Sequence, residues 1–212
     1  MITISAFKWV PPFAQGYVRD LRARWALEEA GLPYQARLID ADDQRSSAYR
    51  ALQPFGQVPA LEEDGLTMFE SGAIVLHVAA RSEALLPASE PGRARAVTWL
   101  LAALNTIEVV VQPLAEIDVF HADKEWAKLR RPEAELAVKK RLRELSTWLG
   151  ERDYLEGNFT AGDLMMATVL RNLKHTDLLQ AEPNLAAYVA RCEARPAFQR
   201  ALQGQLDAFK RH

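Results

Sequence analysis

The sequence predicts an α/β first domain with the element order βαβαββα, followed by a domain made only of helices. Two observations carry this prediction. Up to about residue 81, short apolar or alternating segments typical of strands take turns with helical patterns. After a proline-containing stretch, only long helical patterns follow. The expected organisation is a first domain over 1–81, a linker over 82–92 and a helical domain over 93–212.

The first helix is expected from Tyr17 to Ala30, after a short apolar strand from Ile2 to Phe7. Apolar residues recur within this helix at helical spacing and share one face, whereas its charged residues, including Arg22, are expected largely on the other faces. Gly31 is expected just past the helix end, because glycine adopts the left-handed conformation readily, and Pro33 prevents the helix from continuing.

The rest of the first domain combines a strand, a short helix, a hairpin and a longer helix. Asp64-Gly65 is typical of a two-residue hairpin turn, so the segments on either side of it are expected to pair as antiparallel strands. In order, the expected elements are a strand over 34–38, a short helix around 46–52, strands over 58–62 and 66–69, and a helix over 71–81.

The helical domain contains one clear capping signal. Thr160 and Asp163 form a capping box, in which each side chain accepts a hydrogen bond from the backbone of the other residue. We interpret this motif as structural, so that Asp163→Ala should weaken folding and not ligand binding. The expected helices run over about 93–120, 124–149, 160–175 and 184 to the end, with a break at Pro196.

Composition and charge exclude several classes of function. Lys and Arg number 26 against 28 Asp and Glu, a net charge of −2, so the chain lacks the basic face that nucleic acid requires. No apolar run reaches the roughly 18 residues that span a membrane, and no secretory signal is visible. The one cysteine, Cys192, favours a cytoplasmic location and a buried apolar role, and the four scattered histidines predict no metal.

A first candidate motif is Gly56-Gln57-Val58-Pro59-Ala60-Leu61. Proline has no amide to donate, so Pro59 is expected at a strand start or edge. A sharper interpretation is a cis Val58–Pro59 bond, which would turn the Val58 backbone outward to pair with an extended ligand. Both interpretations remain open from the residues alone.

A second candidate motif is Glu70-Ser71, which precedes an apolar helix. Ser71 is placed to cap that helix, and this role alone would explain it. The functional alternative is an anion site, in which the serine hydroxyl and the helix N–H groups hold a carboxylate while Glu70 holds an amine. An acid beside a helix start suits the zwitterionic end of an amino acid.

Taken together, these residues resemble the cytosolic glutathione transferase family, of the bacterial type. The resemblance spans nearly the whole chain, and the stretches that carry it are RWALEEAGLPY, LQPFGQVPALEEDG, FESGAIVLH and FTAGDLMMA. It implies a thioredoxin-like first domain, a linker and a helical second domain. It also implies that glutathione is a co-substrate and that the protein is a homodimer.

The resemblance assigns the glutathione-binding residues. Val58 is expected to pair with the cysteinyl backbone of glutathione, and Gln57 to lie in the same site. Glu70 and Ser71 are expected to take the γ-glutamyl end. Arg45, with Gln44, lies in the segment that usually supplies a partner for the glycyl carboxylate.

The catalytic position departs from the family pattern. The family activates the glutathione thiol with a Tyr, Ser or Cys after the first strand, but the loop from Lys8 to Tyr17 contains no Ser, Thr or Cys. Tyr17 falls where the serine-type classes carry their serine, so we expect it to donate to the sulfur. The alternative is an aromatic packing residue, with Gln15 and loop amides as the donors.

The implied function is nucleophilic attack of glutathione on an apolar electrophile, as in detoxification. The missing loop cysteine favours addition or substitution over reduction of a disulfide. Another glutathione-dependent enzyme, such as a dehalogenase or peroxidase, and a non-catalytic binding module are the alternatives. The family also implies a set of side chains that line the electrophile pocket, for which plain core is the other interpretation: Trp9, Phe13, Asn105, Val109, Phe120 and Trp126.

Overall fold

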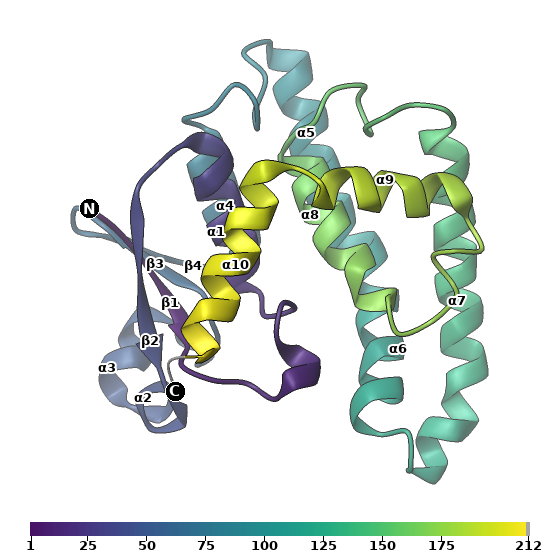
Figure 1. Cartoon of the computed structure of the whole chain (residues 1–212), viewed down its shortest axis with the longest axis horizontal. Coiled ribbons are helices and arrows are strands. Elements are labelled where there is room, and N and C mark those ends of the chain that lie inside the picture. Colours follow the sequence, from purple (N-terminus) through teal and green to yellow (C-terminus); the bar gives the residue numbers. More distant parts are fainter. Residues whose placement is uncertain (211–212) are drawn as a thin grey trace. The chain divides into compact units, whose positions relative to one another are not determined.

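The computed structural model describes residues 1–210, which form two compact units (Figure 1). The first unit consists of Met1–Ser89 together with the chain from Ala194 onward, and the second is Glu90–Glu193. A thioredoxin-like α/β unit and a helical unit confirm the expected fold class. The last helix belongs to the α/β unit, whereas the boundaries drawn from the sequence group it with the helical domain.

The first unit is built on a four-stranded sheet with the spatial order β2-β1-β3-β4. β1 (Ile2–Phe7) is parallel to β2 (Tyr34–Ile39) and antiparallel to β3 (Ala60–Glu63), which in turn is antiparallel to β4 (Leu66–Phe69). These directions bring the C-terminal ends of β1, β2 and β4 and the start of β3 to one edge, which we call the site end of the sheet. The segments next to this end carry Tyr17 and all the residues expected from the sequence to bind glutathione.

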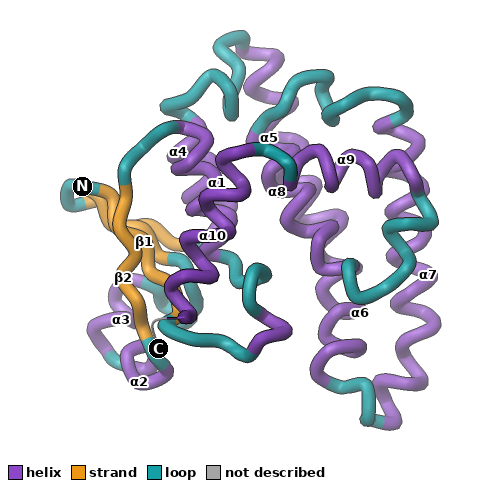
Figure 2. Tube along the Cα trace, viewed as in Figure 1, coloured by secondary structure: helices purple, strands orange, loops and turns teal. Residues whose placement is uncertain are grey.

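Helices lie on both sides of the sheet. In Figure 2, α1 (Asp20–Ala30), α4 (Ser71–Ala79) and α10 (Pro196–Lys210) lie on one side, and α2 (Ala41–Arg45) and α3 (Ser47–Leu52) on the other. α1 contacts both α4 and α10. The first helix is therefore packed between the sheet, a neighbouring helix and the C-terminal helix, which explains its burial.

The first helix differs from its prediction in two respects. It begins at Asp20 and not at Tyr17, because the residues before it form tight turns, with the Tyr17 N–H donating to the Ala14 carbonyl at 3.0 Å. Arg22, expected away from the apolar face of the helix, is buried all the same, because α1 is enclosed on several sides. The helix end is confirmed: Gly31 has the left-handed φ of 66°.

Helix α2 was not predicted, because its residues show no apolar periodicity. A reciprocal capping box holds its start. The Asp40 side chain accepts from the Asp42 and Asp43 amides at 3.0 Å, and the Asp43 side chain accepts from the Asp40 amide at 3.0 Å. The hydrogen bond from the Asp43 backbone is the largest cause that lowers the pKa of Asp40 to about 2.

The C-terminal helix docks against α1 through apolar and charged contacts. The rings of Trp25 and Phe198 meet edge to face with centroids 4.8 Å apart. Near the start of α10, Arg195 donates to both carboxylate oxygens of Glu29 at 2.6 and 2.8 Å. These contacts fix α10 as an integral layer of the first unit.

The second unit is organised around a helix that is buried along its whole length. All ten residues of α8 are buried, and α8 packs against α5 and α9. The capping box at its start is confirmed, since Asp163 accepts from the Thr160 amide at 2.9 Å. The elements are α5 (Glu90–Ala102), a π-helical segment (Ala103–Glu108), α6 (Val109–Phe120), α7 (Glu125–Leu149), α8 (Ala161–Leu170), a 3₁₀ turn (Arg171–Leu173) and α9 (Pro183–Glu193).

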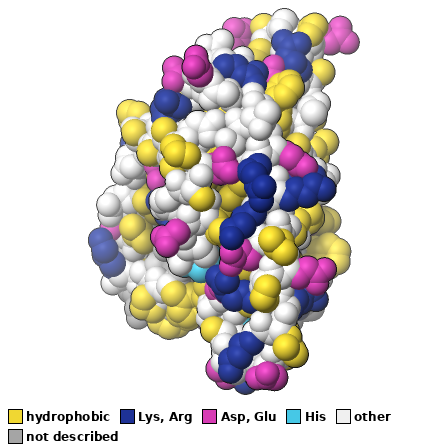
Figure 3. All heavy atoms as spheres, turned by 90° about the vertical axis from the view of Figure 1, so that its right-hand side faces the viewer, with side chains coloured by type: hydrophobic (Ala, Val, Ile, Leu, Met, Phe, Trp, Pro, Cys, Tyr) yellow, Lys and Arg dark blue, Asp and Glu magenta, His cyan; other side chains and the backbone are white. Residues whose placement is uncertain are grey.

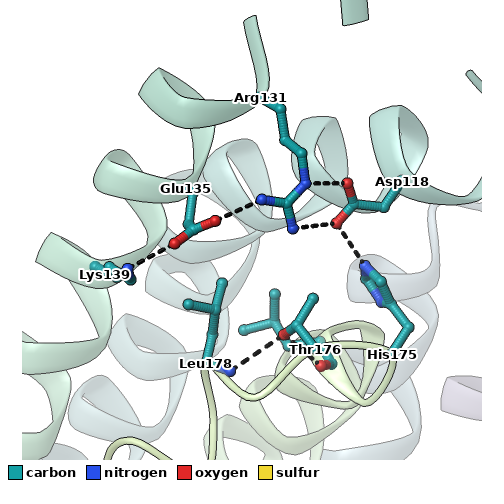
Figure 4. A network of polar contacts seen from close by, with 8 residues as sticks. Asp118, Arg131, Glu135, Lys139, His175, Thr176 and Leu178 are labelled. Atoms are coloured by element: carbon teal, nitrogen blue, oxygen red, sulfur yellow. Dashed lines mark hydrogen bonds and ion pairs between the residues drawn. The ribbon is translucent and has the colours of Figure 1, made fainter. Parts of the chain in front are cut away.

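A polar network ties α6 to α7 and to the segment after α8 (Figure 4). Arg131 of α7 donates to both carboxylate oxygens of Asp118 in α6, at 2.7 and 3.1 Å. His175 Nε2 lies 3.1 Å from the same carboxylate, and Lys139 pairs with Glu135, which also binds Arg131. Several basic residues of α7, Arg131 and Lys139 among them, are thus paired with acids, which fits the interspersed charges of its sequence.

The surface charges and one long apolar helix are relevant to the two classes of function that the sequence argues against, nucleic-acid binding and membrane insertion. Figure 3 shows one face of the molecule, on which basic, acidic and hydrophobic side chains are interspersed. The continuous helix Glu90–Phe120 is long and apolar enough to cross a membrane by length and composition alone. Core helices of soluble proteins share these properties, so this is weak evidence for a membrane span.

Candidate functional site

The loop after β1 begins at the site end of the sheet and leads to α1. Within it, Pro12–Ala14 forms a 3₁₀ turn, and Gly16 adopts a positive φ of 85°, a conformation that glycine accommodates without strain. The Gln15 side chain donates to the Val10 carbonyl at 3.2 Å, so this amide is engaged within the loop. The loop is therefore a series of tight turns with Tyr17 at its far end.

Tyr17 lies three residues before α1 and is 39% exposed. A side chain with that exposure is not enclosed in the core, which weighs against the interpretation as a plain packing residue. It remains the one hydroxyl-bearing residue of the loop. Its role as the thiol-activating donor stays a prediction.

The Val58–Pro59 bond is cis, which confirms the expectation from the first motif. The Val58 side chain is buried in a small apolar cluster with Ile39 and Tyr49, against which Val18 also packs. Within residues 1–210, neither the Val58 N–H nor its C=O has a hydrogen-bond partner. The side chain thus anchors the residue while its backbone is available to an extended ligand.

The segment before Val58 is held by α2 and α3. The Gln44 side chain donates to the Gly56 carbonyl at 2.5 Å, and the Tyr49 hydroxyl donates to the Gln57 carbonyl at 2.6 Å. The Gln57 side chain itself is exposed. Helix α2, which the sequence did not predict, therefore helps to place the backbone of the Gln57-Val58 segment.

The Glu70-Ser71 motif begins α4, but with roles shifted by one residue. Ser71 is the first helical residue and Glu70 is the N-cap, without a side-chain capping bond, so the expected cap role of Ser71 is wrong. Glu70 has φ 70°, a left-handed conformation that costs a non-glycine residue about 1–3 kcal/mol. Its exposed carboxylate has no partner among residues 1–210, which a purely structural N-cap does not explain.

Arg22 joins this motif, which the sequence did not indicate. Its guanidinium, in a residue only 4% exposed, donates to the Ser71 hydroxyl at 3.2 Å. The two residues are 49 positions apart, and Arg22 falls among the charged residues expected off the apolar face, so no local signal could have found the pair. The buried guanidinium of Arg22 therefore lies next to the Ser71 hydroxyl at the start of α4.

Arg45 lies at the end of α2 and is exposed. It donates to Asp42 one turn earlier, at 2.6 Å, so its guanidinium is engaged within its own helix. Its expected role toward a glycyl carboxylate stays a prediction. The six side chains named for an electrophile pocket, from Trp9 to Trp126, are all exposed, so none of them is plain core.

Comparison with known proteins covers both units. The model described as "Glutathione S-transferase, N-terminal domain" matches residues 14–80, and "Glutathione S-transferase, C-terminal domain" matches 110–204. The chain is 30% identical to glutathione S-transferase 4 of Zea mays over 213 residues, which covers 94% of this chain and 92% of that protein. It is 29% identical to a glutathione S-transferase of Hyoscyamus muticus, with 86% and 92% covered.

Solved structures give the same result. A theta class glutathione S-transferase from Xanthomonas axonopodis pv. citri, with glutathione bound, superposes with a TM-score of 0.80 at 29% identity, covering 97% of this chain and 98% of that one. A glutathione transferase from Burkholderia graminis, with two glutathione molecules per subunit, gives 0.83 at 26% identity, covering 95% and 87%. With both units matched by sequence and by structure, the chain belongs to the glutathione S-transferase family and is a transferase enzyme of that family.

Proposed function

We propose that the protein binds glutathione at the site end of the sheet and activates its thiol for attack on an apolar electrophile. The observation that carries this proposal is the meeting of three segments at that end. The loop to Tyr17 leaves β1, the unpaired Val58 backbone precedes β3, and Glu70-Ser71 follows β4. The register pairs Ala60 with Phe69, so the last two segments are neighbours.

Each segment fits one part of glutathione. The Val58 N–H and C=O suit the cysteinyl backbone, as an added strand would. The start of α4, with the Ser71 hydroxyl and Arg22 behind it, suits the α-carboxylate of the γ-glutamyl residue. The exposed Glu70 carboxylate suits its amine, and Gln57 lies in the same site. The glycyl carboxylate then extends toward Arg45.

The chemistry required of the protein is to favour the thiolate. A thiol with a pKa near 8.5 is only about 3% ionised at pH 7. A hydrogen bond donated to the sulfur stabilises the thiolate, and a shift of two pKa units corresponds to about 2.7 kcal/mol. We assign this donation to the Tyr17 hydroxyl. No metal takes part in this mechanism.

The remaining parts of the proposal concern setting and assembly. The exposed aromatic residues Trp9 and Phe13, in the loop after β1, supply apolar surface for the electrophile. We propose a cytoplasmic homodimer that conjugates glutathione to such compounds in detoxification. It binds neither nucleic acid nor membrane in this role.

Calorimetric titration with reduced glutathione tests the site. The double variant Glu70→Ala with Ser71→Ala should lose a few kcal/mol of binding free energy, since hydrogen bonds to charged groups contribute about 1.5–3 kcal/mol each. The matched control replaces Ser82 and Glu83, the serine and glutamate just beyond α4, by alanine. An unchanged dissociation constant in the folded double variant would refute the site.

A further inference from the structure

A buried polar cluster joins the start of α1 to the C-terminal helix. It consists of Asp20, Arg24 and Gln205, and we call it the α1–α10 cluster. The Gln205 side chain, fully buried, donates to an oxygen of Asp20 at 2.6 Å, and the Arg24 Nε donates to the other oxygen at 2.7 Å. An acid, a base and an amide from two helices thus share one site closed to water.

The composition of the cluster is not the one expected if its only role were to stabilise the fold. Burial raises the pKa of Asp20, because desolvation of the carboxylate outweighs the stabilisation from Arg24 and Gln205. Arg24 Nη2 and Gln205 Oε1 are buried without a hydrogen-bond partner within residues 1–210. Apolar side chains of similar volume often stabilise such a position as well or better. Buried polar groups of this kind are best known for fixing the register of packed helices.

The group that this cluster places is the backbone beside Tyr17. The Gln205 amide donates a second hydrogen bond, to the Val18 carbonyl at 3.1 Å. Val18 directly follows Tyr17, and its side chain packs on the cluster of apolar residues that contains Val58. One amide from the far end of the chain therefore holds the junction between the loop and α1.

We propose that Gln205 is a positioning residue for thiol activation, which places the end of the Lys8–Tyr17 loop through the Val18 carbonyl. The inference rests on the proposed function, in which this loop supplies the donor to the glutathione sulfur. Gln205 does not touch the thiol. It sets the distance and direction from which the loop can donate, so its loss should affect the thiol more than the affinity for glutathione.

The test compares two glutamine variants on the same helix. Gln205→Met keeps an unbranched side chain of similar volume and removes both donated hydrogen bonds. The matched control, Gln203→Met, removes an exposed glutamine that donates to Asp207 at 2.7 Å. Both variants are full-length, and the thiolate absorbance of the glutathione complex is titrated with pH. Turnover of an aryl halide and the melting temperature are measured in parallel.

The expected result is specific to the thiol. In Gln205→Met the bound thiol should titrate at higher pH and kcat at pH 7 should fall about three- to tenfold, while the dissociation constant of glutathione changes less than about twofold. The deficit in kcat should shrink at a pH above the pKa of the free thiol. Gln203→Met should match the wild type. A Tyr17→Phe background should remove most of the Gln205→Met effect.

Three results would overturn the inference. One is an unchanged titration and kcat in folded Gln205→Met, and another is an equal loss in the control. If Gln205→Met does not fold, the test uses Gln205→Asn, which keeps the amide group on a shorter side chain. The third contradicting result is then a thiol titration in Gln205→Asn that matches the wild type. A wild-type complex whose thiol titrates as free glutathione would instead refute the proposed function itself.

Discussion

At the scale of single residues, the serine at the start of α4 has a defined hydrogen-bond polarity. Ser71 accepts from the Arg22 guanidinium, which can only donate, so the serine hydroxyl keeps its own proton to donate to an anion. The buried positive charge adds to the partial positive charge at the helix N-terminus. Arg22 thus orients Ser71 as a donor and raises the local potential for a carboxylate.

Replacing this arginine should therefore weaken ligand binding. Arg22→Met keeps an unbranched side chain and should reduce glutathione affinity about tenfold, equivalent to roughly 1.4 kcal/mol. Isothermal calorimetry measures the effect. Arg200→Met serves as control, because Arg200 is an exposed residue of the same unit that pairs with Glu28. Wild-type affinity in a folded Arg22→Met protein would show that the pair is structural only.

A second residue-scale feature connects the hairpin with α4. Glu63 at the end of β3 accepts from Arg81 beyond α4 and lies 3.2 Å from His77 Nε2. The hydrogen bond from Arg81 is the largest cause that lowers the pKa of Glu63 from 4.5 to about 2. A carboxyl whose pKa is lowered on folding adds stability above its unfolded pKa, and this stability is lost as pH falls toward 2.

The expected consequence is a stability difference that depends on pH. Arg81→Gln should lower the unfolding free energy at pH 7 by up to about 1 kcal/mol, as for a partly exposed ion pair. The difference from the wild type should diminish between about pH 4.5 and 2. Urea unfolding at several pH values measures it. A difference that stays constant down to pH 2 would contradict the assignment to Glu63.

At the scale of elements, the start of α8 depends on one buried carboxylate. Asp163 accepts from the Leu155 and Thr160 amides, both at 2.9 Å, and from the Tyr188 hydroxyl at 3.0 Å. Burial raises the pKa of this carboxyl. A single residue thus satisfies donors from a loop, a helix start and a neighbouring helix, all within the second unit.

Removing this carboxylate should destabilise the protein without a direct effect on the site. Asp163→Ala leaves several buried donors unpaired, at about 1–3 kcal/mol each, so the melting temperature should fall strongly. Asp163→Asn retains one acceptor oxygen and should lose less. The folded fraction should bind glutathione with wild-type affinity. A specific loss of affinity at unchanged stability would show that the motif is functional.

The elements with strong local signals were predicted well, and those set by contacts at a distance were not. β1 and the end of α1 at Gly31 follow from an apolar run and a helix stop signal. Helix α2 was missed, although the Asp40 and Asp43 capping box was a usable signal. The cis Val58–Pro59 bond and the start of α4 next to Glu70 were predictable, because both follow from local sequence signals. The role of Arg22 depends on a partner 49 residues away, which no local pattern encodes.

At the scale of the whole molecule, exposed aromatic surface on the first unit is relevant to the proposed homodimer. Phe55 and Phe69 are both exposed, and their rings meet edge to face with centroids 6.1 Å apart. Such a pair costs free energy in water and stabilises an interface when buried. Its place on the first unit agrees with the proposed homodimer, in which this unit docks on the helices of a second subunit.

The dimer makes a direct prediction for the mass in solution. Light scattering at micromolar concentration should give twice the chain mass of 23.8 kDa. Phe55→Glu places a charge in the expected interface and should shift the protein toward the monomer. Phe55 lies two residues before Gln57 of the proposed site, so glutathione binding by the variant is measured together with its mass. A wild-type mass of one chain would contradict the dimer.

The central claim is that the loop ending at Tyr17 activates the glutathione thiol, and the pH titration of the bound thiol tests it most directly. Tyr17→Phe keeps the ring and deletes the hydroxyl, so the melting temperature should move little. The thiolate absorbance of the complex should appear at higher pH, and turnover at neutral pH should fall about ten- to a hundredfold, equivalent to roughly 1.4–2.7 kcal/mol. A titration and a rate that both match the wild type would contradict the role of Tyr17 and direct the search to Gln15 and the loop amides.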